Sequence, residues 1–332
     1  MGDTWDWDEG WARLDEVPDT QDAFAHHGLA VTSAGEVVGF HARRLVVFDR
    51  RGHVARVSEP GLFEGHQITL VRDDGDERLW IADPGICLHA KPGGNLGHGL
   101  EIVGGPGRAV MVSMEGEILS EMPRPSLPHG VAYMPTSVAV DERDLGGSGD
   151  VWVADGYGSG LVHRYDEHGD LMTTIDGEAA AGRFDCPHAV FIDRRRGDPE
   201  LYVADRGNAR VQVFDLGGAF LRSFGEGVLT SPSSFAVRGE TLLIAELHAR
   251  LAVFDGGDEL VEYIGENSEV ADEPGWPNGL DKDHNVIRTG RLRPGKFNSP
   301  HAVAVDGEGS VFVAEWLVGG RYTKLTRRSN SS

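Results

Sequence analysis

A short sequence frame recurs six times along this chain of 332 residues. In each copy an alternating apolar stretch is followed by a turn and by a second apolar stretch, which ends in Ala-Asp or Ala-Glu in every copy after the first. A third stretch follows and often ends in an aromatic residue and Asp. A Gly-containing turn and a fourth stretch complete the unit. The copies begin at His27, His66, Thr136, His188, Ser233 and His301. Four short antiparallel strands per unit, repeated six times, predict an all-β fold, a six-bladed β-propeller.

Two spacings between copies are longer than the others, those from 66 to 136 and from 233 to 301. Both contain Gly/Pro-rich or charged inserts without another aromatic-Ala-Asp strand, so we interpret them as loops, with a seven-bladed ring as the alternative. The second blade is expected to take its third strand from Ala109–Ser113, after its insert. The 46 Gly and 16 Pro residues, spread along the chain, also favour an all-β repeat fold.

We expect three parts in the chain. Residues 1–24 form an N-terminal segment that pairs with the last blade, through a strand near Trp11–Asp15, and so removes the open edge of the ring. Residues 25–325 form the propeller, and residues 326–332 form a disordered tail.

The net charge of −22 bears on the partners of this protein. It opposes nucleic-acid binding, because phosphate-binding surfaces need clustered Lys and Arg. No apolar run has the length of a membrane span, and no signal peptide is visible at the N-terminus, so we expect a cytoplasmic monomer without a membrane contact. The two cysteines, Cys87 and Cys186, fall in different repeats and are expected to be reduced.

Three of the six copies begin with a histidine in a shared frame, namely His66, His188 and His301, and they alternate with the others. In a closed ring of six units every second unit is about 120° from the next, so three imidazoles would converge on the axis of the propeller. Three imidazoles are the ligand set of an open zinc site, and we therefore predict zinc. The first copy is ambiguous, because either His27 or the neighbouring His26 could occupy the equivalent position.

A second set of candidates follows the Ala-Asp strand end, where loops return over the same mouth of the channel. It comprises Arg43, Tyr157, Arg206, His248 and Trp316. A tyrosine near a dication can ionise below its ordinary pKa of about 10 and act as a base. An arginine beside it can bind a carboxylate through two hydrogen bonds. The alternative for these residues is packing at the blade edges with charges facing solvent.

The strand-end acids Asp83, Asp155 and Asp205 resemble a chemical set, but one acid per blade in a fixed frame is typical of a structural role. Such a carboxylate usually caps a turn or accepts hydrogen bonds from neighbouring backbone. We therefore predict that these acids stabilise the loops and do not take part in chemistry.

Three stretches resemble a known family, the NHL-repeat propellers and, more specifically, peptidyl-α-hydroxyglycine α-amidating lyase and its bacterial relatives. The stretches are Pro135–Tyr157, Pro187–Phe214 and Pro300–Asp306. The similarity runs from about Gly28 to the C-terminus and is weak in the long inserts. The paired Asp-Gly-Tyr and Ala-Asp-Arg-x-Asn motifs are its most specific part.

The resemblance implies a role for each candidate. His66, His188 and His301 would be zinc ligands, Tyr157 the catalytic base, and Arg206 the residue that binds substrate and stabilises charge. Arg43 would match an arginine of the first blade, with Arg44 as the alternative in a shifted register. The implied reaction breaks the N–Cα bond of an α-hydroxyglycine and yields an amide and glyoxylate.

The sequence departs from that family at several positions. In the animal enzyme an acid directly after the third histidine binds calcium, and here that residue is Ala302, so calcium is not expected. Gly65 stands where the second histidine frame usually has proline. We therefore predict a metal-dependent lyase acting on a small α-hydroxy amide (carbinolamide) or peptide-like substrate. The alternatives are a non-catalytic propeller that binds a protein or ligand, and a calcium-dependent lactonase-like hydrolase, whose sites use carboxylate and amide oxygens.

Overall fold

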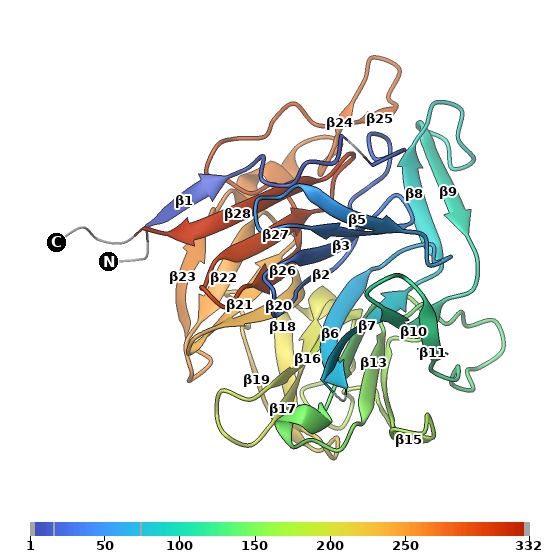
Figure 1. The fold of residues 1–332 in the computed structure, drawn as a ribbon, viewed down its shortest axis with the longest axis vertical. Coiled ribbons are helices and arrows are strands. Elements are labelled where there is room, and N and C mark those ends of the chain that lie inside the picture. The colour runs from blue at the N-terminus through green and yellow to red at the C-terminus, as the bar shows by residue number, and fades with distance from the viewer. Residues whose placement is uncertain (1–3, 16, 74, 329–332) are drawn as a thin grey trace.

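The structure, a computed structural model, describes residues 4–15, 17–73 and 75–328. These residues form six four-stranded antiparallel sheets and two small hairpins, which confirms the predicted six-bladed β-propeller (Figure 1). Within this part of the chain, none of the helices combines the length and the apolar character that a membrane span requires.

Each blade is formed by strands that are nearly all consecutive in the chain. Blade 1 contains β2 (Leu29–Val31), β3 (Val37–His41), β4 (Arg44–Phe48) and β5 (Val54–Ser58). Blade 2 contains β6 (Gln67–Asp73), β7 (Asp76–Asp83), β10 (Arg108–Ser113) and β11 (Ile118–Glu121). Blade 3 contains β12 (Ser137–Val140), β13 (Val151–Asp155), β14 (Leu161–Tyr165) and β15 (Leu171–Ile175). Blade 4 contains β16 (Pro187–Asp193), β17 (Glu200–Asp205), β18 (Arg210–Asp215) and β19 (Phe220–Phe224).

The last two blades and the short elements complete the fold. Blade 5 contains β20 (Pro232–Arg238), β21 (Thr241–Glu246), β22 (Arg250–Phe254) and β23 (Leu260–Ile264). Blade 6 contains β26 (Pro300–Val305), β27 (Val311–Glu315), β28 (Arg321–Arg327) and β1 (Trp5–Asp8). Three short 3-10 helices are η1 (Arg143–Leu145), η2 (Arg206–Asn208) and η3 (Ser268–Asp272).

The two long spacings hold hairpins instead of a seventh blade. One insert contains β8 (Ile86–Ala90) and β9 (Leu100–Gly104), which pair with each other and project from the ring in Figure 1. The other contains η3 and the two-residue strands β24 (Gly279–Leu280) and β25 (Val286–Ile287). As predicted, the third strand of blade 2 follows the insert, because β10 pairs with β7.

The ring closes through its N-terminal strand. β1 pairs with β28, so that the first and last parts of the chain share one sheet (Figure 1). The closing strand is Trp5–Asp8 and not the segment near Trp11 that we expected. Trp11 packs instead in the core, with its ring centroid 5.6 Å from Phe48 and 4.9 Å from Phe312. The strand β28 extends to Arg327, so it includes the start of the segment predicted to be a tail, and residues 329–332 lie outside the described residues.

The core lies between the blades. Each of the six interfaces between neighbouring blades holds its own cluster of buried apolar side chains. In blades 1, 3, 4 and 5 the third and fourth strands are joined by a hairpin. An aromatic residue at its start is buried, and the Asp that follows accepts backbone hydrogen bonds. At Tyr165-Asp166, for example, Tyr165 is 1% exposed, and Asp166 Oδ1 accepts hydrogen bonds from the backbone N–H of His168 and Asp170. This arrangement explains why the aromatic-Asp pair recurs in the sequence.

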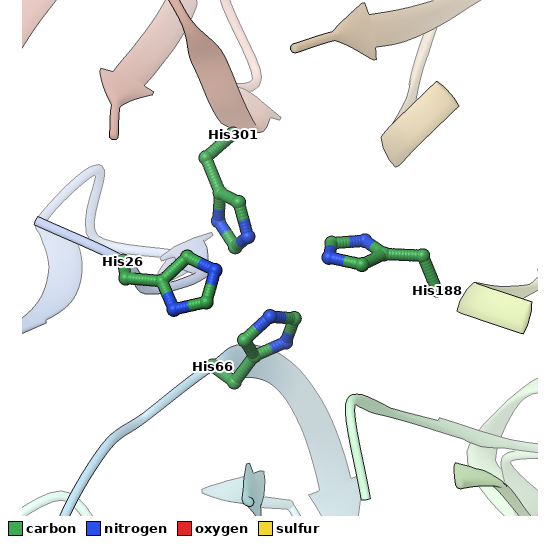
Figure 2. Close-up of side chains that lie close together, drawn as sticks. All are labelled: His26, His66, His188 and His301. Carbon is green, nitrogen blue, oxygen red and sulfur yellow. The ribbon is translucent and has the colours of Figure 1, made fainter. Parts of the chain in front are cut away.

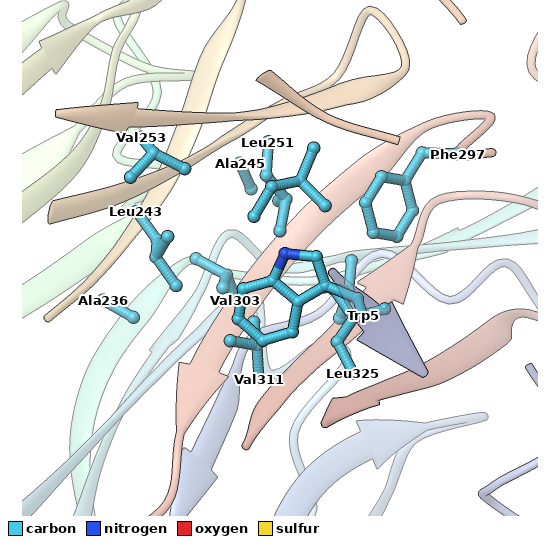
Figure 3. Close-up of a cluster of buried hydrophobic side chains, with 12 residues drawn as sticks. Trp5, Ala236, Leu243, Ala245, Leu251, Val253, Phe297, Val303, Val311 and Leu325 are labelled. Atoms are coloured by element: carbon cyan, nitrogen blue, oxygen red, sulfur yellow. The ribbon is translucent and has the colours of Figure 1, made fainter. Parts of the chain in front are cut away.

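Trp5 stabilises the closure of the ring. Its indole is 9% exposed and lies among side chains of blades 5 and 6, including Leu243, Val303 and Leu325 (Figure 3). We expect Trp5→Ala to lower the free energy of unfolding by about 3–5 kcal/mol, because it empties a large volume in the core. Asp6→Ala, on the same strand but exposed, is the control, with an expected change of about 0–1 kcal/mol. Chemical denaturation measures both, and equal effects would show that Trp5 does not hold the ring closed.

Candidate metal centre

Four buried histidines converge at one mouth of the central channel (Figure 2). His66 directly precedes β6, His188 and His301 lie at the starts of β16 and β26, and His26 lies in the loop before β2. One ring nitrogen of each histidine lies within 4.8 Å of those of the other three. His66, His188 and His301 are fully buried and His26 is 7% exposed. The structure therefore brings the three predicted histidines together and adds a fourth.

The three shared histidines are oriented by backbone carbonyl oxygens of the neighbouring blades, which lack a shared histidine. His66 Nδ1 lies 2.7 Å from the carbonyl oxygen of Thr136, which opens the next blade. His188 Nδ1 lies 2.8 Å from the carbonyl oxygen of Ser233 in the same relation. His301 Nδ1 lies 3.2 Å from the carbonyl oxygen of His27, across the closure of the ring. A carbonyl oxygen only accepts, so each Nδ1 carries the hydrogen and each Nε2 presents a lone pair to the channel axis.

The strand-end acids hold the loops that carry the histidines. Asp83 accepts hydrogen bonds from the backbone N–H of Phe63 and Glu64, just before His66. In the same way Asp205 accepts from Asp185, and Glu315 accepts from Asn298 and Ser299, before the other two shared histidines. Asp155 accepts from Met134, before Thr136. These contacts confirm the structural role predicted for the acids.

Tyr157 reaches into the cluster from the loop after β13. Its Oη lies 3.0 Å from His66 Nε2, 3.0 Å from His26 Nε2 and 3.1 Å from His188 Nε2. Arg206, at the start of η2, places its Nη1 3.4 Å from this hydroxyl and its Nη2 3.2 Å from Cys186 Sγ. The two residues from different blades thus meet beside the imidazoles, as their places after the strand ends predicted.

Burial controls the charge of the cluster. It lowers the pKa of His26 to about 3, and it holds the pKa values of His66, His188 and His301 well below their usual range. The Arg206 guanidinium lowers all four pKa values further, and neighbouring imidazoles lower those of His66, His188 and His301. The four rings are therefore neutral at neutral pH, which is the state in which imidazole binds a metal.

The cluster has more hydrogen-bond acceptors than donors, as expected for a site that binds a cation. Tyr157 has one hydroxyl hydrogen, yet the Nε2 atoms of three histidines lie within hydrogen-bond distance of its oxygen. His301 Nε2 is buried without a hydrogen-bond partner among the described residues. Buried polar atoms are rarely left unpaired, so several inward lone pairs with too few donors indicate a site for a positive ion. Nitrogen donors suit zinc and related transition metals more than calcium, which takes oxygen ligands.

The remaining candidates have other positions. Arg43 lies in the turn between β3 and β4, exposed, with its guanidinium 4.9 Å from the ring centre of Phe63. Among the described residues, Arg43 forms no hydrogen bond or ring contact with the four histidines or Tyr157. His248 packs against Trp276, with 5.5 Å between ring centroids, and the Trp316 ring lies 5.2 Å from that of His26. Cys87 and Cys186 are both free thiols.

The ambiguity between His26 and His27 is resolved by the structure. His27 points away from the cluster, and its ring hydrogen-bonds to the Gly28 carbonyl and to the hydroxyl of Tyr322. His26 enters the cluster, and its Nδ1 lies 3.1 Å from Oε1 of the buried Glu64. Glu64 was not predicted. Its only signal in the sequence is an acid two residues before His66, which is too common a pattern to identify it.

The fold and the cluster define this protein as a six-bladed β-propeller with a buried group of four histidines at one mouth of its channel. Comparison with known sequences gives related proteins of two kinds. NHL repeat-containing protein 3 of Homo sapiens is 27% identical over 293 residues, which cover 83% of this chain and 71% of that protein. No protein-family model matches the chain.

Two further relatives carry the names of lyases. The "Probable peptidyl-alpha-hydroxyglycine alpha-amidating lyase" of Caenorhabditis elegans is 25% identical over 307 residues, which cover 87% of this chain and 79% of that protein. Peptidyl-alpha-hydroxyglycine alpha-amidating lyase 1 of Drosophila melanogaster is 30% identical over 218 residues, which cover 59% of this chain and 35% of that protein. These relatives confirm the resemblance that the motifs indicated.

Solved structures share the fold at low sequence identity. A protein of unknown function from Bacteroides thetaiotaomicron has a TM-score of 0.62 at 14% identity, covering 98% of this chain and 77% of its own. Virginiamycin B lyase from Staphylococcus aureus has a TM-score of 0.55 at 13% identity, covering 98% of this chain and 100% of its own. These similarities concern the fold alone.

Proposed function

We propose that this protein is a metal-dependent lyase that cleaves the N–C bond of a small α-hydroxy amide. The observation that carries the proposal is the position of Tyr157 Oη, 3.0–3.1 Å from three inward-facing imidazole nitrogens and next to Arg206. A potential base, a guanidinium and a set of neutral imidazoles are thus held together in one site. The lyases among the relatives support the same reaction class.

His66, His188 and His301 would hold the metal, and zinc is the metal that we propose. When bound, such an ion would polarise an oxygen of the substrate as a Lewis acid. The three histidines suit this task because neighbouring backbone carbonyls fix their rings before any ligand arrives. Ala302 follows the third histidine and offers no oxygen from its side chain, so the site gives no support for calcium there.

Tyr157 would take the proton of the substrate hydroxyl at Oη. The carbon–oxygen bond then becomes a carbonyl, the N–C bond breaks, and its electron pair and a proton go to the leaving amide nitrogen, without net oxidation. In the protein alone burial raises the pKa of Tyr157 above its usual value, and Arg206 opposes that rise. A dication held by the adjacent histidines would add to the effect of Arg206 and lower this pKa, so that Tyr157 could ionise and act as a base.

Arg206 would bind a carboxylate or carbonyl of the substrate and stabilise developing charge. Its guanidinium already lies beside the Tyr157 hydroxyl, and it keeps its positive charge at any physiological pH. We propose the same class of role for Arg43. Its guanidinium lies over the ring of Phe63, three residues before His66, and it would contact a more distant part of the substrate.

The proposal is tested by elemental analysis of the purified protein, followed by an assay with N-acyl-α-hydroxyglycines. We expect about one zinc per chain, with release of amide and glyoxylate in equal amounts. A protein that binds no metal in stoichiometric amount would instead support a non-catalytic propeller that binds a protein or ligand. A metal-loaded protein without activity on any α-hydroxy amide would contradict the proposed reaction.

A further inference from the structure

The fourth histidine is held differently from the other three. His26 lies in the loop before β2, and its Nδ1 faces the carboxylate of Glu64 at 3.1 Å. The other three rings are instead held through backbone carbonyls. The His26 ring also lies close to two of them, with 4.6 Å between its centroid and that of His66 and 4.4 Å to that of His301. His26 is therefore part of the cluster but has a support of its own.

A close crossing of two chain segments produces this pair. Gly28 passes so near to the start of β6 that a Cβ on it would lie 2.4 Å from the backbone nitrogen of Ile68. Its N–H donates to the carbonyl oxygen of Gly65 at 2.9 Å. Because only glycine fits at this crossing, the loop with His26 and the loop with Glu64 come together there.

Glu64 is buried beside His26, and half of its carboxylate is unpaired. Glu64 is 7% exposed, and its Oε2 is buried without a hydrogen-bond partner among the described residues. In the described part of the chain, the hydrogen-bond partner that we find for its other oxygen is the neutral His26 ring. A buried carboxylate without a compensating charge is strongly unfavourable. A metal ion bound to His26 Nε2 would supply that charge through the ring.

We propose that His26 is a fourth nitrogen ligand of the metal and that Glu64 is the carboxylate that orients and strengthens it. This inference rests on the metal centre proposed above. A carboxylate on the far nitrogen of a ligating histidine fixes its tautomer and raises its basicity, so the carboxylate–histidine–metal arrangement recurs in metal sites. The site then has four imidazoles, and an oxygen of the substrate can join them only if the metal accepts five or more ligands.

The test uses cobalt(II), whose visible spectrum reports the number and geometry of its ligands. The metal is removed from the full-length protein, cobalt(II) is added, and affinity is measured by competition with a chelator. The variants are His26→Ala and Glu64→Gln, with His248→Ala as a matched control at the same mouth, where its ring packs against Trp276 and not against the cluster. Circular dichroism verifies that each variant is folded.

We expect His26→Ala to bind cobalt(II) about 10–100-fold more weakly and to change the spectrum, and added imidazole to restore the original spectrum by filling the vacated position. Glu64→Gln is expected to weaken binding about 10-fold while keeping the spectrum of the wild type. The control should match the wild type in both. If His26→Ala keeps the wild-type affinity and spectrum, His26 is not a ligand, and the three-histidine centre still stands. If the wild type itself binds no cobalt(II), the proposed metal centre fails, and this inference fails with it.

Discussion

Replacing His188 by alanine is expected to abolish metal retention while the propeller stays folded. His188 is fully buried, its Nδ1 is held by Ser233, and its Nε2 faces the site. Loss of a residue that only supports a metal ligand typically weakens metal binding about 10–100-fold, and loss of a ligand itself should weaken it by at least as much. The fold should survive because the six apolar clusters between the blades do not include this side chain.

Metal content after gel filtration, measured by elemental analysis, gives the result. The matched control is His163→Ala, which also removes a buried imidazole but one whose Nδ1 contacts Thr174 Oγ1 within blade 3. The control should lose some stability and keep its metal. Full metal occupancy in His188→Ala would refute the ligand assignment.

The second large effect is expected for Tyr157→Phe, which removes only the hydroxyl oxygen. Metal content should stay at the wild-type level, because four imidazoles remain. Turnover of an α-hydroxy amide should fall about 100–10,000-fold, the usual contribution of a positioned acid–base group. Steady-state kinetics on metal-loaded protein would show the loss in kcat.

Tyr133→Phe serves as the control for this variant. Tyr133 is also a buried tyrosine, and its hydroxyl has no hydrogen-bond partner among the described residues, so its removal should leave turnover near that of the wild type. Normal turnover by Tyr157→Phe would mean that another group takes the proton. A loss of metal together with turnover would mean that the hydroxyl has a structural role in the cluster.

The position of the three shared histidines could be predicted because propeller blades are equivalent. Each blade begins at the same place relative to the axis, so residues in the same frame of the repeat meet at the same mouth of the channel. The common frame alone was enough to predict the positions of His66, His188 and His301. The positions of Tyr157 and Arg206 were predicted in the same way, from their place after the strand ends. The structural role of the strand-end acids was predictable for the same reason, because a residue present in nearly every blade usually stabilises the blade itself.

The closing strand was less predictable. Both Trp5–Asp8 and the segment near Trp11 are short, and both offer a tryptophan to the core. The pairing of β1 with β28 depends on contacts between residues more than 300 positions apart. Local sequence therefore identifies an N-terminal strand but does not place it.

The sequence alone predicted six blades, with seven as the alternative, and it determined the three equivalent histidines and the loops that carry Tyr157 and Arg206, because these follow from a repeated local pattern. Only the tertiary structure decided that His26 and not His27 enters the cluster, and that Glu64 supports it. That choice depends on where Gly28 crosses β6, which is a contact between two neighbouring repeats that the local pattern of each repeat does not specify. Adjacent side chains of an extended segment point to opposite sides, so the crossing selects one histidine for the site and directs the other into the core.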